Sequence, residues 1–295
     1  MTAADPGNFD LYGGLSGANI EVGSFDFGQG IILAKCYALL MSNYVVAFRP
    51  PKPPDDFGAP WKPVKGGWSV AIGSEIFLPT SYQPPSPYDR TDTVWWIVSL
   101  LRLRATSHVF SPVLCNVSFS QASETPVESL HLWPVETVPR EIWEHEPSNS
   151  VSAVDLQWVG SVWDRARTLR SENKAFALAT LAFDQCTFVT QPELAMVSLW
   201  GALESLFSPD PYELRFRVSA NIAAFLEPPG LARLELHSRV MKLYDARSKA
   251  AHGLLADLEQ PLRDSYALTK RILVKIIDDN KVPTRDALRA SLFGA

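Results

Sequence analysis

The sequence is poor in cysteine and lacks the common patterns of metal-binding residues. Its 295 residues include only three cysteines, Cys36, Cys115 and Cys186, which are odd in number and far apart. Without a Cys-x-x-Cys pair the sequence supports neither a disulfide framework nor a cysteine zinc site, and His-Glu-x-x-His is also missing. We therefore expect no metal and no other cofactor, and a reduced, cytoplasmic setting fits best.

The chain also lacks long apolar runs and glycine-rich nucleotide motifs. No apolar run approaches the roughly 18 residues that a membrane span needs, and the start of the chain, MTAADPGNFD, does not have a signal-peptide pattern. The patterns G-x-x-x-x-G-K-[ST], G-x-G-x-x-G and G-x-S-x-G are absent. We therefore expect no membrane partner, and we find no support for a P-loop or a hydrolase elbow.

The charge is unevenly distributed along the chain. The net charge of −5, with 46% hydrophobic and 20% charged residues, is ordinary for a globular protein and excludes a strongly basic nucleic-acid binder. Residues 1–150 hold 9 basic against 15 acidic residues, whereas residues 151–295 hold 18 against 17. A polyanion would therefore meet less repulsion from the second half.

Proline marks the first half, which holds 16 of the 23 prolines. Short segments rich in β-branched and aromatic residues predict strands there: Ile31–Leu33, Tyr44–Phe48, Trp68–Ile72, Ile76–Leu78 and Pro112–Phe119. We predict turns at Gly13-Gly14 and Gly66-Gly67 and an extended loop over Pro50–Pro63. The pattern of apolar residues in Thr91–Arg104 is compatible with either a helix or a buried strand. We predict an α+β domain over residues 1–148, dominated by an antiparallel sheet, which senses or binds an unknown ligand.

The second half carries repeated helix signals. Helix starts are indicated at four places: Ser152 with Asp155, Thr190 with Glu193, Asp210-Pro211, and Thr284. Gly253 indicates a helix end. We predict a second, all-α domain over residues 149–295, a bundle of about five to seven helices. Its basic run Arg165, Arg167 and Arg170 could touch RNA phosphates or form a solvated helix face.

The segment from Lys242 to Gly253 combines groups suited to phosphate chemistry. Arg247 offers a planar fork of donors, and His252, five residues later, can change charge near neutral pH. On an unbroken helix these two residues lie about 140° apart and share no face. Either the helix breaks between them, with Asp245 capping a new start, or the site draws on a second chain.

With its flanking sequences, this segment resembles a known family. LYDARSKAAHG, preceded by WGALESLF and ELRFRVSANIAAFL, is similar to the Apea-like group of the HEPN superfamily (higher eukaryotes and prokaryotes nucleotide-binding domains), which is marked by Arg-x-x-x-x-His in a helical bundle. The resemblance covers about residues 190–278. Many members have Asn, Asp or His directly after the arginine, where this chain has Ser248.

The resemblance implies a metal-independent endoribonuclease that acts as a homodimer through its helical domain. Arg247 and His252 would be catalytic, and Glu204, Tyr244, Asp245 and Ser248 would support them. Because one histidine cannot easily be both base and acid, two copies of His252 would share the proton transfers, leaving a 2′,3′-cyclic phosphate and a 5′-hydroxyl. By analogy alone, such a chain could be a toxin or a phage-defence effector.

Two alternatives stay open. The bundle could be a catalytically inactive module that binds RNA or nucleotide or mediates dimerisation, with Arg247 a surface charge and His252 a helix cap. Alternatively, the sheet-rich half could carry the function, with the bundle as its scaffold.

Overall fold

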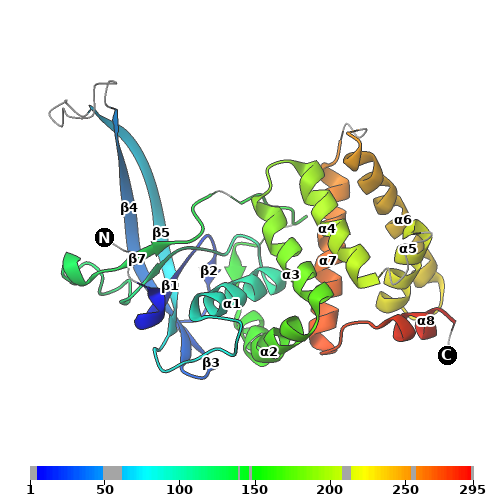
Figure 1. Ribbon diagram of the computed structural model, residues 1–295, viewed down its shortest axis with the longest axis horizontal. Helices are drawn as coiled ribbons and strands as arrows, with labels where there is room; N and C mark the ends of the chain where they lie inside the picture. The colour runs from blue at the N-terminus through cyan, green and yellow to red at the C-terminus, as the bar shows by residue number, and fades with distance from the viewer. Residues whose placement is uncertain are drawn as a thin grey trace.

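The computed structural model describes residues 5–48, 62–138, 140–145, 148–207, 214–253 and 257–293, and the side chains of all of these except 41–48 and 62–68. The fold is mixed: a six-stranded antiparallel sheet lies at one end and most of the helices at the other (Figure 1). The strands are β1 (Leu11–Ser16), β2 (Asn19–Ile20), β3 (Ser24–Gly28), β4 (Ile31–Phe48), β5 (Lys62–Leu78), β6 (Phe110–Cys115), β7 (Leu132–Pro134) and β8 (Ser150–Val151). The helices are α1 (Arg90–Arg104), α2 (Ala153–Glu172), α3 (Lys174–Gln185), α4 (Pro192–Phe207), α5 (Leu214–Leu226), α6 (Leu231–Ala251), α7 (Glu259–Asp278) and α8 (Arg285–Phe293).

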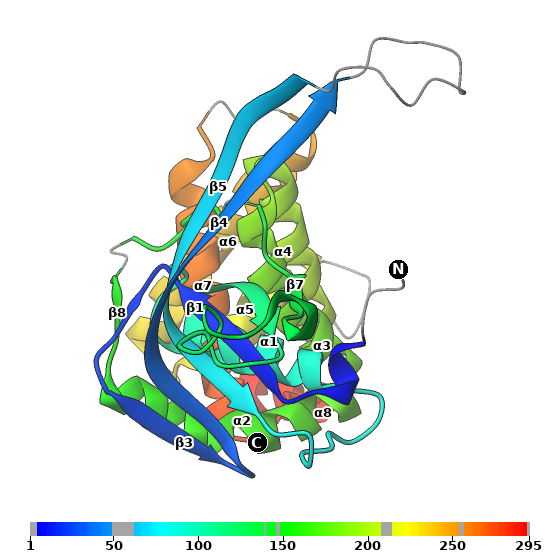
Figure 2. The same ribbon diagram turned by 90° about the vertical axis from the view of Figure 1, so that its left-hand side faces the viewer.

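The sheet has the order β3-β4-β5-β1-β6-β7, and β2 and β8 form a separate parallel pair. Four of the predicted strands are parts of β4 and β5, which pair from Ile32 with Phe77 out to Phe48 with Lys62. Beyond the strands that flank them, β4 and β5 continue as a two-stranded arm that projects from the body (Figure 2). The predicted loop Pro50–Pro63 lies outside the described residues, except that β5 already includes 62–63.

The prediction of turns at two glycine pairs was wrong. Gly13-Gly14 lies inside β1 and Gly66-Gly67 inside β5. At Gly13 a Cβ atom would come within 2.5 Å of Val94 Cγ1 on α1. Gly13 is thus needed because helix and sheet approach closely there, not because the chain turns.

The stretch Thr91–Arg104, for which helix and strand stayed open, is helix α1. Asp89 and Asp92 form a reciprocal capping box at its start. The helix lies on the sheet and also packs against α2, where Trp96 Nε1 donates to the carbonyl oxygen of Trp163 over 2.9 Å. This helix therefore joins the sheet to the helical bundle.

The predicted helical bundle is present, with seven helices, α2–α8, in the described part of residues 149–295. The capping box of Ser152 and Asp155 is confirmed, and the Thr284 hydroxyl accepts from the amide of Ala287 over 3.3 Å at the start of α8. The signal at Asp210-Pro211 lies outside the described residues. Helix α4 packs against α3, α5, α6 and α7, so its residues reach the centre of the bundle.

One apolar core extends through both parts of the chain, from Leu11 in β1 through Ile97 in α1 to Ile276 in α7. The division into domains at residue 148 stays a prediction. None of the described helices is long and apolar enough to cross a membrane.

Candidate functional site

Helix α6 carries both residues of the Arg-x-x-x-x-His pattern and does not break between them. It runs from Leu231 to Ala251, and His252 is its C-terminal cap. The predicted end at Gly253 is confirmed: Gly253 has φ +66° and its amide donates to the Ala250 carbonyl over 3.0 Å. Helical spacing therefore keeps Arg247 and His252 on different sides of α6.

Asp245 does not cap a new helix start. Its carboxylate forms a two-pronged ion pair with Arg215 of α5, with Nε–Oδ1 and Nη2–Oδ2 distances of 2.6 Å each. The pair is exposed on both sides. Asp245 thus joins α5 to α6 and is not among the contacts of Arg247.

Arg247 is held by Glu204 of α4. Its Nη2 lies 3.2 Å from Glu204 Oε2, and the other carboxylate oxygen accepts a hydrogen bond from the Tyr244 hydroxyl over 2.8 Å. The side chains of Arg247 and Glu204 are 24% and 20% exposed, so solvent reaches both. The buried Nε of Arg247 has no hydrogen-bond partner among the described residues. The guanidinium is therefore oriented by one carboxylate while part of its donor fork stays unused.

Tyr244 is positioned in turn by the bundle core. Its ring meets Trp200 edge to face, with centroids 5.3 Å apart, and Trp200 Nε1 donates to Ser265 Oγ of α7 over 3.0 Å. Burial, together with the hydrogen bond to the Glu204 carboxylate, raises the pKa of Tyr244 to about 12. Its phenol therefore stays protonated at neutral pH and serves as a donor that fixes Glu204.

His252 lies at the exposed end of the helix. Its side chain is solvent-exposed and that of Ser248 is half-buried, and neither has a polar partner in the described part of the chain. A ligand could reach this imidazole directly. The structure thus brings Glu204, Tyr244 and Arg247 together, whereas Asp245 turns to α5 and Ser248 stays unpaired.

Within one chain, this arrangement offers one guanidinium for an anion and one imidazole for a proton. A cleavage that needs both a base and an acid is therefore incomplete in a single copy. Among the described residues, no three His, Cys, Asp or Glu side chains are grouped so that they could hold a metal ion.

Only one arginine of the basic run on α2 is buried, and all three contact other parts of the chain. Arg167 is buried beside Tyr82 and Asp164, and Arg165 Nη1 lies 3.4 Å from the Asp278 carbonyl oxygen. Arg170 lies over the rings of Tyr88, Trp95 and Trp96 at 4.8–5.3 Å from their centroids. Arg167 therefore packs in the interior, whereas Arg165 and Arg170 are partly exposed.

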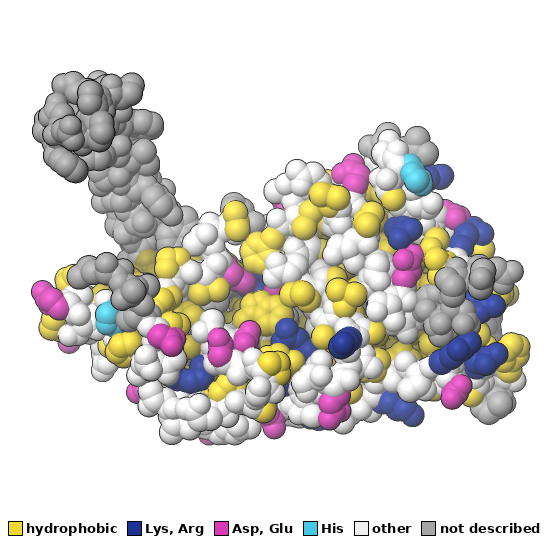
Figure 3. Space-filling view, viewed as in Figure 1, with side chains coloured by type: hydrophobic (Ala, Val, Ile, Leu, Met, Phe, Trp, Pro, Cys, Tyr) yellow, Lys and Arg dark blue, Asp and Glu magenta, His cyan; other side chains and the backbone are white. Residues whose placement is uncertain are grey.

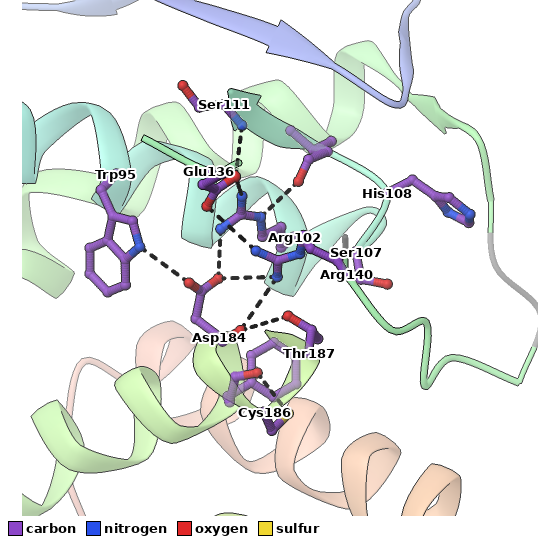
Figure 4. A network of polar contacts seen from close by, with 12 residues as sticks. Trp95, Arg102, Ser107, His108, Ser111, Glu136, Arg140, Asp184, Cys186 and Thr187 are labelled. Atoms are coloured by element: carbon purple, nitrogen blue, oxygen red, sulfur yellow. Dashed lines mark hydrogen bonds and ion pairs between the residues drawn. The ribbon is translucent and has the colours of Figure 1, made fainter. Parts of the chain in front are cut away.

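A second arginine cluster, which the sequence analysis missed, lies between the sheet and the bundle (Figure 4). Arg102 of α1 pairs with Glu136 and, over 2.9 Å, with Asp184 of α3, and Arg140 lies 3.5–3.6 Å from the same two carboxylates. Trp95 Nε1 also donates to Asp184 over 3.2 Å. All four charged side chains are almost fully buried.

The signal for this cluster in the sequence is slight. Arg102 interrupts a stretch that begins at Trp95 and is otherwise apolar except for Ser99, but its partners are 34 and 82 residues away. Only the tertiary structure brings them together.

Comparison with protein-family models, with curated proteins and with solved structures finds no match for this chain.

Proposed function

We propose that this chain is a metal-independent endoribonuclease of the HEPN type that acts as a homodimer in the cytoplasm. The observation that carries the proposal is the end of α6: a partly exposed Arg247 held by Glu204, followed by the exposed imidazole of His252. An oriented guanidinium and a free imidazole are the groups that cleavage of RNA without metal requires.

In this mechanism His252 of one copy takes the proton of the ribose 2′-hydroxyl. The 2′-oxygen forms a bond to phosphorus, and the bond from phosphorus to the 5′-oxygen breaks. The second copy's His252 gives a proton to that 5′-oxygen, which leaves as a hydroxyl. The products are a 2′,3′-cyclic phosphate and a 5′-hydroxyl end, and no water or metal takes part.

Arg247 has a different task in the reaction. The phosphorane carries more negative charge than the starting diester. The planar guanidinium can donate hydrogen bonds to two of its oxygens. Glu204 keeps this fork in place and Tyr244 keeps Glu204 in place, so both are positioning residues. The sheet-rich part would restrain or trigger the nuclease on binding a ligand, as expected of a toxin or defence effector.

The test is RNA cleavage in EDTA by the wild type and His252→Ala. The variant should cut at least about 100-fold more slowly, because proton transfer typically contributes two to four orders of magnitude. His145→Ala is a matched control, since His145 is also exposed and pairs only with surface groups. The cut ends should be a cyclic phosphate and a 5′-hydroxyl, and an RNA with 2′-O-methyl riboses should resist.

The second candidate is a module that binds RNA without cutting it. One observation favours it: Glu204 already occupies one nitrogen of Arg247. In that case the wild type would retain labelled RNA in a filter assay, Arg247→Ala would release it, and no product would form. Equal rates of cleavage by the wild type and His252→Ala would contradict the proposal that this chain is a ribonuclease that uses His252.

A further inference from the structure

Helices α5, α6 and α8 carry exposed apolar side chains at the end of the molecule away from the sheet (Figure 1). Phe216 of α5 is 58% exposed, and Leu231 and Leu234 of α6 are 70% and 60% exposed. On the side shown in Figure 3, hydrophobic side chains at this end reach the surface among Lys and Arg. Exposed aromatic and aliphatic groups gathered in this way mark interaction surfaces.

An open groove follows α6 along this face. One part, of about 380 Å³, is lined by Gly230, Phe216, Leu234 and Leu292 among others. The other part, of about 530 Å³, shares Phe216 with the first and reaches Met241. From Gly230 to Met241 the groove follows α6 for eleven residues, which is about 16 Å or three helical turns. It is therefore long enough for a docked helix of similar length.

The helices that form the groove are basic, although the chain as a whole is acidic. Within their bounds, α5, α6 and α8 hold nine Lys and Arg against three Asp and Glu, a net charge of +6 in a chain whose net charge is −5. Ion pairs with Asp264 of α7 and Glu204 of α4 offset two of these charges, those of Arg239 and Arg247. The remaining positive charge attracts a partner that carries negative charge.

Two polar side chains that line the groove are not fully satisfied by the chain itself. Arg233 donates to the uncharged carbonyl oxygens of Glu227 and Ser291 over 2.8 and 3.0 Å, and it has no carboxylate partner among the described residues. His237 meets the Phe216 ring edge to face, with centroids 5.3 Å apart, and its buried Nε2 has no hydrogen-bond partner in the described part of the chain. A carboxylate docked in the groove would balance the charge of Arg233.

We propose that the groove binds an acidic amphipathic helix of another protein, with the apolar side of that helix on Phe216 and Leu234 and a carboxylate at Arg233. Neighbouring helices present ridges and grooves into which a further helix packs. Three turns place apolar side chains at positions i, i+3 or i+4, and i+7 on one side, which is the pattern that binds an apolar groove. The proposal does not depend on the ribonuclease.

Other occupants fit this face less well. In a two-fold pairing with a second copy each patch would meet its own image, so the unbalanced charge of Arg233 and its neighbours would repel. An RNA strand binds through its phosphates and through bases stacked on aromatic rings. Most of the apolar lining here is aliphatic instead: Ala220, Ala223, Leu234 and Leu292. Apolar side chains bordered by positive charge favour a protein helix.

The first experiment selects random phage-displayed peptides of about 16 residues on the full-length wild type and discards those that also bind Leu234→Asp. We expect the remaining peptides to carry net negative charge and to have apolar residues at intervals of three and four. Basic peptides, or peptides without this spacing, would contradict the proposal. A selection in which no peptide depends on Leu234 would contradict it as well.

The second experiment measures the affinity of a selected peptide by fluorescence anisotropy. The dissociation constant should rise at least about tenfold in Leu234→Asp, which places a charge in the apolar centre of the groove. It should rise less in Arg233→Gln, and this smaller effect should shrink at about 1 M salt, because salt screens the attraction. Leu194→Asp is the matched control, since Leu194 on α4 is 59% exposed and lines neither part of the groove. Unfolding curves verify that the variants fold, and equal losses in Leu194→Asp and Leu234→Asp overturn the proposal.

Two further measurements distinguish the other occupants. A dimer that Leu234→Asp dissociates in the ultracentrifuge would show that a second copy fills the groove. Single-stranded RNA that displaces the peptide and binds Leu234→Asp less tightly would show that the groove is a nucleic-acid site. Either result overturns the proposal, whereas an unchanged mass and unchanged RNA binding in Leu234→Asp support it.

Discussion

The arginines between α1 and α3 and the arginine at the end of α6 both pair with carboxylates, yet solvent reaches only the second pair. The side chains of Arg102 and Asp184 are 1% and 0% exposed, whereas those of Arg247 and Glu204 are 24% and 20% exposed. In the buried cluster, burial lowers the pKa of Arg102, but the charges of Asp184 and Glu136 more than offset this and raise it. Every charge there already has its partners.

The difference shows that an arginine–carboxylate pair by itself says little about function. In the buried cluster Arg102 uses all its nitrogens: Nε donates to the Val109 carbonyl over 2.7 Å, and the two terminal nitrogens meet Glu136 and Asp184. The buried Nε and Nη1 of Arg140 have no hydrogen-bond partner among the described residues. At the end of α6 one carboxylate orients a guanidinium that solvent reaches, although its Nε is buried. The two arrangements differ in burial: solvent is excluded from the first and reaches the second.

The largest effect is expected from Arg102→Met. Removing this guanidinium leaves Asp184 and Glu136 buried beside the single charge of Arg140, and breaking a buried pair in this way typically costs 3–5 kcal/mol, so we expect about that loss. Arg247→Met should cost about 1 kcal/mol, because solvent reaches Glu204 and Tyr244 still donates to it. Urea unfolding of both variants measures these losses in the free energy of unfolding. Equal losses would contradict the distinction between the buried and the partly exposed pair.

A smaller effect, with a characteristic pH dependence, is expected from Tyr244→Phe. Loss of the hydrogen bond to Glu204 should cost about 1 kcal/mol at neutral pH. Because the pKa of Tyr244 is about 12 in the folded chain and about 10 when unfolded, the folded state holds this proton more tightly. The contribution is thus complete below pH 10 and is lost as pH rises toward 12.

Urea midpoints of the wild type and Tyr244→Phe, measured at pH 9 and pH 11, check this. The difference between the urea midpoints of the two proteins should be smaller at the higher pH, since the other tyrosines titrate alike in both. A gap that stays constant would show that the hydroxyl does not face the carboxylate.

The local signals in the sequence were reliable because they depend on neighbouring residues. The capping box at Ser152 and Asp155 and the helix end at Gly253 are found where they were expected. Thr91–Arg104 could not be assigned from periodicity, since α1 is buried on most sides and its apolar residues do not alternate with polar ones.

What the sequence could not predict depends on distant contacts. Glycines in β1 were taken for turns because a close approach of α1 leaves no trace in the local pattern. Likewise, no spacing rule links Arg102 to Asp184, or Arg167 to Tyr82. At the site, the resemblance suggested that Glu204, Tyr244 and Arg247 act together, whereas the partner of Asp245 emerged only from the packing of α5 on α6.

The smallest effect is expected at the pair of Arg215 and Asp245, which is the most exposed of the three arginine–carboxylate pairs. Arg215 and Asp245 have the best geometry of the three sites, but their side chains are 48% and 44% exposed. Water and salt screen such charges, and holding two long side chains costs entropy, so good geometry need not stabilise the fold. In a double-mutant cycle of Arg215→Gln and Asp245→Asn, followed by urea unfolding at a concentration where the chain is monomeric, we expect no coupling in 1 M salt and barely measurable coupling at low salt. A coupling energy as large as that between Arg102 and Asp184 would mean that geometry, and not burial, sets the strength of these pairs. The distinction between the buried and the exposed arginines would then lose its basis.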